Sequence, residues 1–488
     1  MSSFWIVMVL VSYFGLLLLI SGITGRRADN LGFFLGNRAS PWYVVAFGMI
    51  GASLSGVTFI SVPGWVGSSH FAYLQMVLGY MAGYQVIVHF LLPLYYRLGL
   101  TSIYSYLESR FGFWSHKSGA FYFILSRTIG SAARLFIASA VLQMALYDSL
   151  GIPFWAGVLI TIVLIWLYTY RGGIKTIIWT DTLQTLFMLL ALVLTIGFVW
   201  SETGLDFGGL VEQFRERGYS RIFHFEHFKS DRLHFIKYFL GGMFITITMT
   251  GLDQDMMQKN LSCRSLKDAQ KNMNWFSLSL IPVNLLFLFL GALLYLFASM
   301  KGIALPVASD DLFPMIATQG FMPGFITLIF IIGLTAAAFS SADSAMTALT
   351  TAITVDMLGV GRRSEDEIKR MRIKVHLVLA VVMLGVILLF KSLNNRSIID
   401  TIFTIAGYTY GPLLGLYAFG MFSRRLVNDR WVPLVVLLSP VLTFGLQALS
   451  PRILGGYVFG FELLLINGLL TVLMLWLIKK PGGTRLSQ

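Results

Sequence analysis

The chain has 488 residues, of which 56% are hydrophobic and only 12% are charged. A soluble globular protein carries about 25% charged residues, and so apolar a chain would expose large hydrophobic patches in water. This composition excludes a soluble enzyme, a disordered chain and a fibrous protein, and it indicates a protein surrounded by a lipid bilayer. The net charge is +13. We expect no nucleic-acid partner, because basic residues collect on the cytoplasmic loops of membrane proteins.

A membrane-spanning helix needs about 20 mostly apolar residues, and this length predicts about thirteen such segments along the chain. Because the start of the chain lacks the charged region of a signal peptide, we expect the first segment to be retained. The segments lie near Phe4–Ile23, Trp42–Trp65, Phe71–Tyr96, Ser118–Tyr147, Pro153–Tyr168, Ile174–Trp200, Phe235–Met257, Trp275–Ser299, Gly324–Met357, Val375–Lys391, Ile399–Phe422, Val432–Leu449 and Phe461–Ile478.

Lysine and arginine gather in every second loop between these segments, whereas the short loop 66–70 has neither. Cytoplasmic loops carry an excess of Lys and Arg. We therefore expect a multi-pass protein of the plasma (inner) membrane, with the N-terminus outside and the C-terminus in the cytoplasm. The basic residues assigned to cytoplasmic loops include Arg26, Arg38, Arg97, Arg110, Arg171, Lys259, Arg264, Arg363 and Arg424.

The second segment combines small and hydroxyl residues in the middle of the membrane. It contains the run GASLSGVT at residues 51–58, followed by Pro63. Such a run predicts a discontinuous helix, because unwound backbone exposes carbonyl groups that bind cations in a dry cavity. A small-residue surface for helix packing is the alternative interpretation.

Two aspartates stand inside apolar segments, where a charge is costly unless it is paired or used. Asp343 shares one helical face of the ninth segment with Ser340, Ser344 and Thr347. Hard oxygen ligands without sulfur or imidazole suit an ion such as sodium, and a proton relay is the competing use of Asp343. Asp181 lies about two turns into the sixth segment, where polar neighbours predict a hydrogen-bonded network.

Three motifs then indicate a family. The run GGIKTIIWTDTLQ at residues 172–184 resembles the signature of the solute:sodium symporters, which include sodium-coupled carriers of sugars, proline, sialic acid, iodide and vitamins. The stretch from Ser340 to Asp356 is similar to the sodium-binding helix of that family, and GLDQDMMQK at residues 251–259 is similar to the end of its seventh segment. The resemblance covers nearly the whole chain.

The resemblance implies an all-α integral membrane protein of the leucine-transporter fold, with two inverted repeats of five helices and discontinuous helices. Residues 1–488 would form a single transporter domain. Within it, residues 42–200 would be the first inverted repeat and residues 235–422 the second. Residues 4–23 would be an accessory first helix, and residues 432–478 two accessory C-terminal helices. In the second repeat we expect the helix break at Gly241-Gly242 or within Thr246–Gly251.

The resemblance also implies sodium as the coupling ion and assigns its ligands. The ion shared by the family would bind the backbone carbonyls of Gly51, Leu54 and Ala337 and the hydroxyls of Ser340 and Ser341.

The sialic-acid branch has a further sodium site, which pairs the aspartate at position 181 with the ninth segment. The matching positions there are Ser340, Asp343 and Ser344. That branch has a hydroxyl where this chain has Asp343. The additional carboxylate would either strengthen a second sodium site or convert it into a proton site.

The substrate pocket is expected beside the first helix break, between the second, third, fourth, seventh and eleventh segments. A small polar solute needs a few polar groups on aromatic walls, although each such group is also explained by helix packing. The candidates are Ser53, Ser55, Thr58, Gln75, Gln85, Phe244, Thr248, Tyr408 and Tyr410.

Arg134 is a further candidate, because it lies about 25 Å along the fourth segment from Ser118 and therefore near the middle of the membrane. A guanidinium at that depth must be paired or hydrated. It would clamp an anionic substrate, or it would pair with a carboxylate such as Asp253 or Asp255. The anion-binding arginine of the sialic-acid branch falls on Gly130, one turn away, so the clamp is not carried over directly.

These features predict a sodium-coupled symporter that takes up a small polar organic solute, such as a sugar, a sialic acid or another carboxylate, by alternating access. The nearest alternative is a proton-coupled symporter of the same fold. An ion channel would need a continuous pore lined by ion-binding rings. A sensor would need a soluble signalling domain, and an integral-membrane enzyme would need a metal or nucleophilic centre in the membrane. The sequence indicates no particular protein partner.

Overall fold

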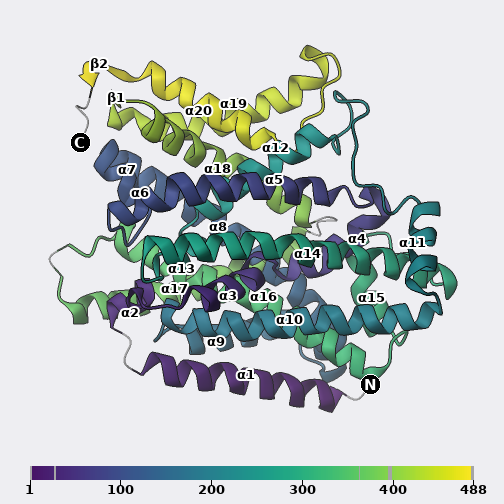
Figure 1. Cartoon of the computed structure of the whole chain (residues 1–488). Coiled ribbons are helices and arrows are strands. Elements are labelled where there is room, and N and C mark those ends of the chain that lie inside the picture. The colour runs from purple at the N-terminus through teal and green to yellow at the C-terminus, as the bar shows by residue number, and fades with distance from the viewer. Residues whose placement is uncertain (1–2, 27–28, 362, 394–397, 485–488) are drawn as a thin grey trace.

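A computed structural model describes residues 3–26, 29–361, 363–393 and 398–484. Its helices run side by side along one direction (Figure 1). Short π-helical turns continue α5, α8, α12 and α16, and the antiparallel strands β1 (Arg425–Val427) and β2 (Lys479–Thr484) pair at one end. The helices are α1 (Ser3–Gly25), α2 (Asn30–Leu35), α3 (Trp42–Ser53), α4 (Gly56–Ser69), α5 (Tyr73–Val86), α6 (Leu92–Arg97), α7 (Ser105–Arg110), α8 (Phe113–Leu142), α9 (Phe154–Thr169), α10 (Ile174–Thr203), α11 (Phe207–Glu216), α12 (Phe235–Thr246), α13 (Gln254–Leu261), α14 (Leu266–Met300), α15 (Leu312–Thr318), α16 (Gly324–Thr351), α17 (Glu365–Leu393), α18 (Ile398–Phe422), α19 (Val432–Ile453) and α20 (Leu463–Leu477).

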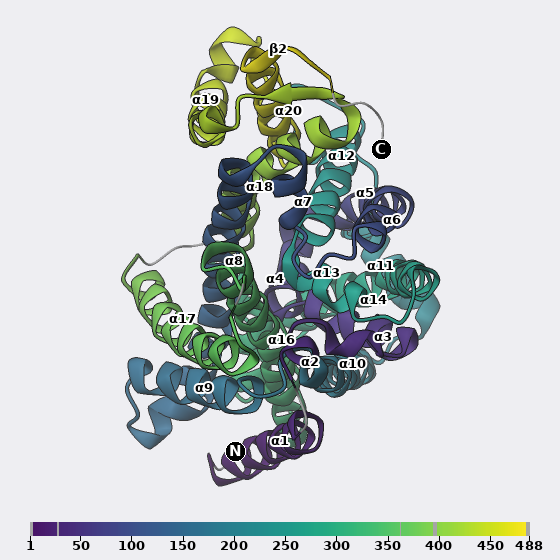
Figure 2. The same cartoon turned by 90° about the vertical axis from the view of Figure 1, so that its left-hand side faces the viewer.

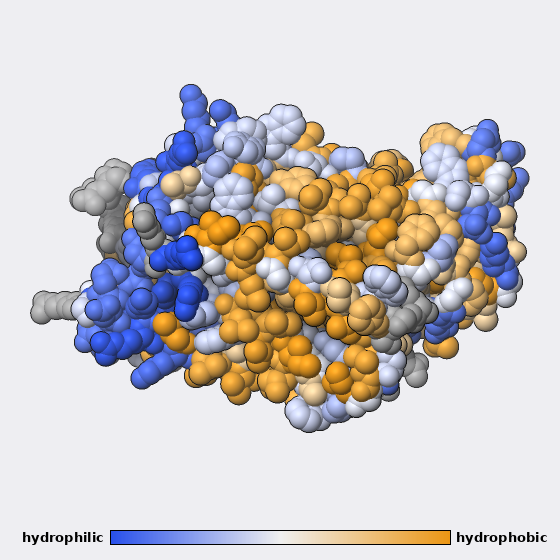
Figure 3. Space-filling model, turned by 90° about the horizontal axis from the view of Figure 1, so that it is seen from below, coloured by the Kyte–Doolittle hydropathy of each residue, from blue (hydrophilic) through white to orange (hydrophobic). Residues whose placement is uncertain are grey.

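The helices have the length and apolarity of membrane spans. In the described part of the chain, 8 helices are long and apolar enough to cross a membrane, or up to 10 if each of two bent pairs counts as one span. The helices α9 and α20 are apolar but shorter. A hydrophobic band crosses the middle of the molecule, and hydrophilic residues gather at the end that holds α2 and α7 (Figures 1 and 3). The prediction of an α-helical membrane protein is confirmed, whereas the count of thirteen segments stays a prediction.

The first helix break lies where the run of small residues predicted it. The helices α3 and α4 are bent by 57° at Leu54 and Ser55, which both leave helical geometry. A methyl group added at Gly56 would stand 3.2 Å from Cβ of Ala338, so the break lies directly against α16. The last carbonyls of α3 have no further turn of helix to donate to them, and they end beside α16.

The second break joins α12 to α13 at an angle of 62°. After the π-helical turn Ile247–Gly251, Leu252 and Asp253 leave helical geometry, and the Asp253 carboxylate caps α13 by accepting from the backbone N–H of Asp255. The break therefore lies just beyond Thr246–Gly251, the second of the two places expected for it. The other place, Gly241-Gly242, lies inside the regular helix α12 and has a packing function instead.

Glycines bring α5 and α12 into backbone contact. A methyl group at Gly79 would lie 2.1 Å from the carbonyl oxygen of Phe239, and one at Gly242 would lie 2.3 Å from that of Met76. Neither position accepts a side chain without displacing main chain. This contact explains why the glycines in α12 do not mark a break, because small residues let helix backbones approach closely.

The helix α16 lies at the centre of the bundle when the molecule is viewed along the helices (Figure 2). It contacts α3, α4, α8, α10 and α13, and its side chains from Gly333 to Thr351 are all buried. Both helix breaks therefore meet the hydroxyl-rich stretch of α16, and this arrangement positions the candidate site.

Candidate functional site

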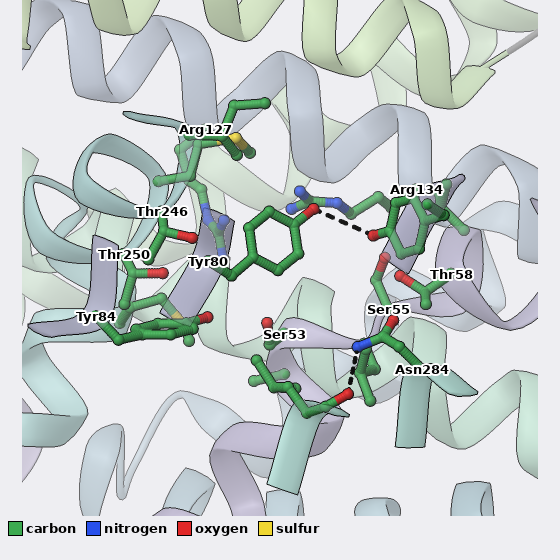
Figure 4. Close-up of a pocket in the computed structure, with 18 residues that line it drawn as sticks. Ser53, Ser55, Thr58, Tyr80, Tyr84, Arg127, Arg134, Thr246, Thr250 and Asn284 are labelled. Carbon is green, nitrogen blue, oxygen red and sulfur yellow. Dashed lines mark hydrogen bonds between the residues drawn. The ribbon is translucent and has the colours of Figure 1, made fainter. Parts of the chain in front are cut away.

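A cavity of about 90 Å³ lies beside the first helix break, and this is room for several water molecules or a small solute (Figure 4). Four of the substrate candidates from the sequence line it, namely Ser53, Ser55, Thr58 and Arg134. The structure adds polar groups from α5, α12, its π-helical turn and α14, which the sequence analysis did not single out. These are Tyr73, Tyr80, Tyr84, Thr246, Thr250 and Asn284.

The three tyrosines form the aromatic wall of the cavity. They stand at intervals of seven and four residues in α5 and therefore share one face of that helix. The hydroxyl oxygens of Tyr73 and Tyr80 are 3.2 Å apart, and the two rings meet edge to face. This spacing was visible in the sequence and would have predicted the wall.

The other substrate candidates are placed away from this cavity. Gln75 is buried and donates to the Leu233 carbonyl, so it holds the loop before α12. Gln85 is exposed and donates to Asn274. These two glutamines bind protein groups outside the cavity because their part of α5 meets a loop and α14.

The aromatic and hydroxyl candidates of the later segments are also engaged elsewhere. Phe244 does not line the cavity, and its half-buried ring packs against the hydrophobic core. Thr248 donates to the carbonyl of Phe244 within its own helix, the usual behaviour of a helical threonine. Tyr408 donates to Gln447. Tyr410 donates to the carboxylate of Asp253 at 2.5 Å, and it lines a smaller neighbouring cavity with Arg134. We do not carry these residues into the substrate site.

Asp253 and Asp255, the carboxylates expected as structural partners of Arg134, instead pair with Arg127. Arg127, two turns earlier in α8, donates to Asp255 and lies 3.7 Å from the Asp253 carboxylate. Arg134 forms neither an ion pair nor a hydrogen bond with the described residues, and it reaches the cavity beside Tyr80 (Figure 4). The cavity therefore contains a guanidinium that forms no ion pair with the described residues, although the more distant Asp253 carboxylate attracts its charge.

The residues assigned to the shared sodium site lie at the first helix break and on the part of α16 that passes it. Gly51 and Leu54 lie in the last turn and at the end of α3, and Ala337, Ser340 and Ser341 lie in the turn of α16 next to Gly56. The Ser341 hydroxyl is fully buried and has no hydrogen-bond partner among the described groups. Buried polar groups are nearly always satisfied, so this hydroxyl fits a cation ligand.

The candidates for a second ion also lie together. The Asp181 carboxylate accepts from Ser340 at 2.7 Å and from Ser344 at 3.3 Å. Asp343 accepts from the Tyr168 hydroxyl at 2.8 Å, and its other oxygen has no hydrogen-bond partner in the described part of the chain.

A lysine that the sequence analysis placed in a cytoplasmic loop completes this cluster. Lys259 lies in α13, and its side chain is only 1% exposed. Its ammonium group is 2.8 Å from Asp181 and 3.7 Å from Asp255. The assignment to a loop was wrong because α13 turns inward after the break and is buried over its whole length.

Two broken helices around a central cavity, next to a helix rich in oxygen ligands, define a secondary active transporter. The sequence model of the sodium:solute symporter family matches residues 33–430. The chain belongs to this family. It is a sodium-coupled symporter and not an enzyme, as the motifs predicted.

Individual relatives agree with this family. The chain is 26% identical over 447 residues to the sodium/sialic acid symporter NanT of Aliivibrio fischeri, covering 89% of this chain and 86% of that protein. It is 25% identical to the sodium/sialic acid symporter SiaT of Proteus mirabilis, covering 86% of this chain and 84% of SiaT. The human sodium/iodide cotransporter is 28% identical, but the chain spans only 61% of its length.

Solved structures confirm the fold. A substrate-bound outward-open Na⁺-coupled sialic acid symporter matches with a TM-score of 0.82 at 20% identity, covering 97% of this chain and 98% of that structure. The transporter Mhp1 in a closed conformation with bromovinylhydantoin bound matches with a TM-score of 0.59 at 14% identity, covering 90% and 92%. The chain thus has the leucine-transporter fold that the resemblance implied. The boundaries of its repeats stay a prediction.

Proposed function

We propose that this symporter carries a small organic anion, with a carboxylate as the recognised group, together with sodium. The observation that carries the proposal is the position of Arg134, whose guanidinium lines the cavity without an ion pair or a hydrogen bond to the described residues. A guanidinium presents a planar fork of donors that matches a carboxylate. A bound carboxylate would supply the paired negative charge that the described residues do not give to Arg134.

The remaining groups in the cavity suit the rest of such a solute. Ser53, Ser55 and Thr58 supply hydroxyls, and the tyrosines of α5 supply an apolar wall with polar edges. The relatives include the two sialic acid symporters named above and also a human sodium-coupled monocarboxylate transporter, and both substrate classes bear a carboxylate. These relatives support an anionic substrate without distinguishing an acidic sugar from a smaller acid.

Sodium would bind at the first helix break through the carbonyls of Gly51, Leu54 and Ala337 and the hydroxyls of Ser340 and Ser341. Sodium at this place would hold the broken helix against α16 and so favour the state in which the solute site is formed. The gradient of the ion would then drive uptake. We also propose that the N-terminus faces outward and that the hydrophilic end with α2, α7 and β2 faces the cytoplasm, because that end collects the basic loops.

A thermal-shift screen of the purified protein tests the substrate class. Sialic acids, monocarboxylates, amino acids and neutral sugars are each added with sodium and with potassium. We expect stabilisation by carboxylates in sodium only. Stabilisation by a neutral sugar that equals or exceeds that of every carboxylate would contradict the proposal.

A further inference from the structure

Lys259 has no place in the function proposed so far, although it lies at the second ion cluster. Its ammonium group is held between Asp181 at 2.8 Å and Asp255 at 3.7 Å. Asp255 is also the ion-pair partner of Arg127, which lines the substrate cavity. Cations and carboxylates therefore alternate from the cavity to Asp181, and Lys259 is fixed from both sides.

The oxygen groups around Asp181 are of the kind that binds sodium. The carboxylate accepts from Ser340 and Ser344, and Asp343 lies on the same stretch of α16 with one oxygen unpartnered among the described groups. Hard oxygen donors of this kind suit a hard cation. A lysine ammonium is a compact single positive charge, and it already stands within contact distance of the carboxylate.

We propose that Lys259 is a built-in counter-ion which replaces a second sodium ion at Asp181, so that this symporter couples one sodium ion to each solute. The proposal rests on the proposed sodium site at the helix break. A sodium ion at Asp181 would have to share one carboxylate with the ammonium group in a buried site, where like charges are weakly screened. The ammonium group of Lys259, which stays in place, therefore excludes a transported sodium ion from Asp181.

The decisive variant is Lys259→Gln, which removes the charge and leaves Asp181, Ser340 and Ser344 available to a cation. Sodium alone is the probe, and the readout is the sodium dependence of thermal stability for the full-length purified protein without solute. In the wild type we expect a single-site dependence with a Hill coefficient of about 1. In Lys259→Gln we expect a second sodium-binding step and a Hill coefficient that rises toward 2 in solute uptake.

Two controls separate charge from folding. Lys259→Arg keeps the positive charge and should keep the single-site dependence. Lys237→Gln removes another buried lysine, which donates to the carbonyls of Lys229 and Val458 away from the cluster, and should leave the sodium dependence unchanged. If Lys259→Gln does not fold, the double variant with Asp181→Asn removes both charges, and it should fold and keep a Hill coefficient of about 1.

Each outcome is informative. Two sodium ions bound by the wild type would overturn the inference while leaving the proposed sodium coupling intact. A stable Lys259→Gln that still shows one site, or that gains a dependence on protons and none on sodium, would also overturn it. A wild type that sodium does not stabilise would instead contradict the sodium site at the helix break, and the inference with it.

Discussion

Arg127 donates to the carboxylate of Asp255 inside the helix bundle, and both side chains are almost completely buried. This pair joins α8 to α13 just beyond the second helix break. Arg127 pairs with Asp255 and lies 3.7 Å from the Asp253 carboxylate. Arg134 forms no ion pair with either aspartate, and it lines the cavity instead. The pair therefore contributes to the fold and, indirectly, to the charge of the substrate site.

Removing one member of this pair should be strongly destabilising. Arg127→Gln leaves Asp255 buried with Lys259, 3.7 Å away, as its remaining charged partner. Breaking a buried ion pair typically costs roughly 3–5 kcal/mol, and the lysine should offset part of that cost. We expect a clear fall in melting temperature and in expression. The double variant Arg127→Gln with Asp255→Asn should recover most of the loss, and a double variant no more stable than the single one would contradict the pairing.

Substitution of Arg134 should weaken substrate binding and not folding, because Arg134 forms no ion pair or hydrogen bond with the described residues. Arg134→Lys keeps a positive charge but loses the bidentate fork. Hydrogen bonds to charged groups contribute about 1.5–3 kcal/mol, so carboxylate binding should weaken by roughly ten- to one-hundredfold while the melting temperature stays near the wild-type value. Calorimetric titration with the best carboxylate measures this. Full-rate transport of a neutral sugar by Arg134→Gln would exclude an anionic substrate.

Ser341 should control the affinity for sodium and leave the solute site in place. The Ser341→Ala variant removes a buried hydroxyl that has no partner among the described groups, so its folding cost should be small. Uptake should then need several times more sodium for half-maximal rate. Ser139→Ala is the matched control, since that hydroxyl is also buried and unpartnered in the described structure but lies near the end of α8. Equal sodium dependence in the two variants would refute the site.

A histidine pair should make the loop before α12 sensitive to acid. His70, between α4 and α5, stacks on His224 of the loop before α12, with ring centres 6.4 Å apart. Burial lowers the pKa of both histidines, and the charge of Arg221 lowers each further. Their folded pKa values lie below the usual 6.5, so the unfolded loop binds protons more readily and loop packing weakens as pH falls below about 6.5.

Hydrogen exchange of residues 204–234 measures this effect. Exchange should accelerate between pH 7 and pH 5 in the wild type, after correction for the intrinsic rate. His70→Phe keeps a flat ring in the stack but cannot take up a proton, and it should reduce the acceleration. The same acceleration in His70→Phe would show that the pair is not the sensor.

The sequence predicted best the features that depend on composition along a single helix. The first break followed from the small residues around Ser53 and Ser55, and the oxygen-rich face of α16 followed from the spacing of Ser340 and Ser344. The helix break and the oxygen-rich face each depend on residues that are close together in the sequence.

Features that depend on tertiary partners were missed. Lys259 has the charge and position of a loop residue, and only the inward course of α13 places it against Asp181. Gln75 has the polarity of a pocket residue, yet its amide forms a hydrogen bond with the loop before α12. Arg127 and Arg134 share one face of α8, and spacing alone does not tell which of them meets a carboxylate.

The interlocked glycines of α5 and α12 limit how the molecule moves. Gly79 and Gly242 bring two main chains so close that neither helix can slide along the other without a collision. We therefore expect the two helices to travel as a single rigid body, although the wall of the cavity comes from one and the second break follows the other. Any rearrangement that exposes the cavity first to one side of the membrane and then to the other must therefore shear along a different contact surface.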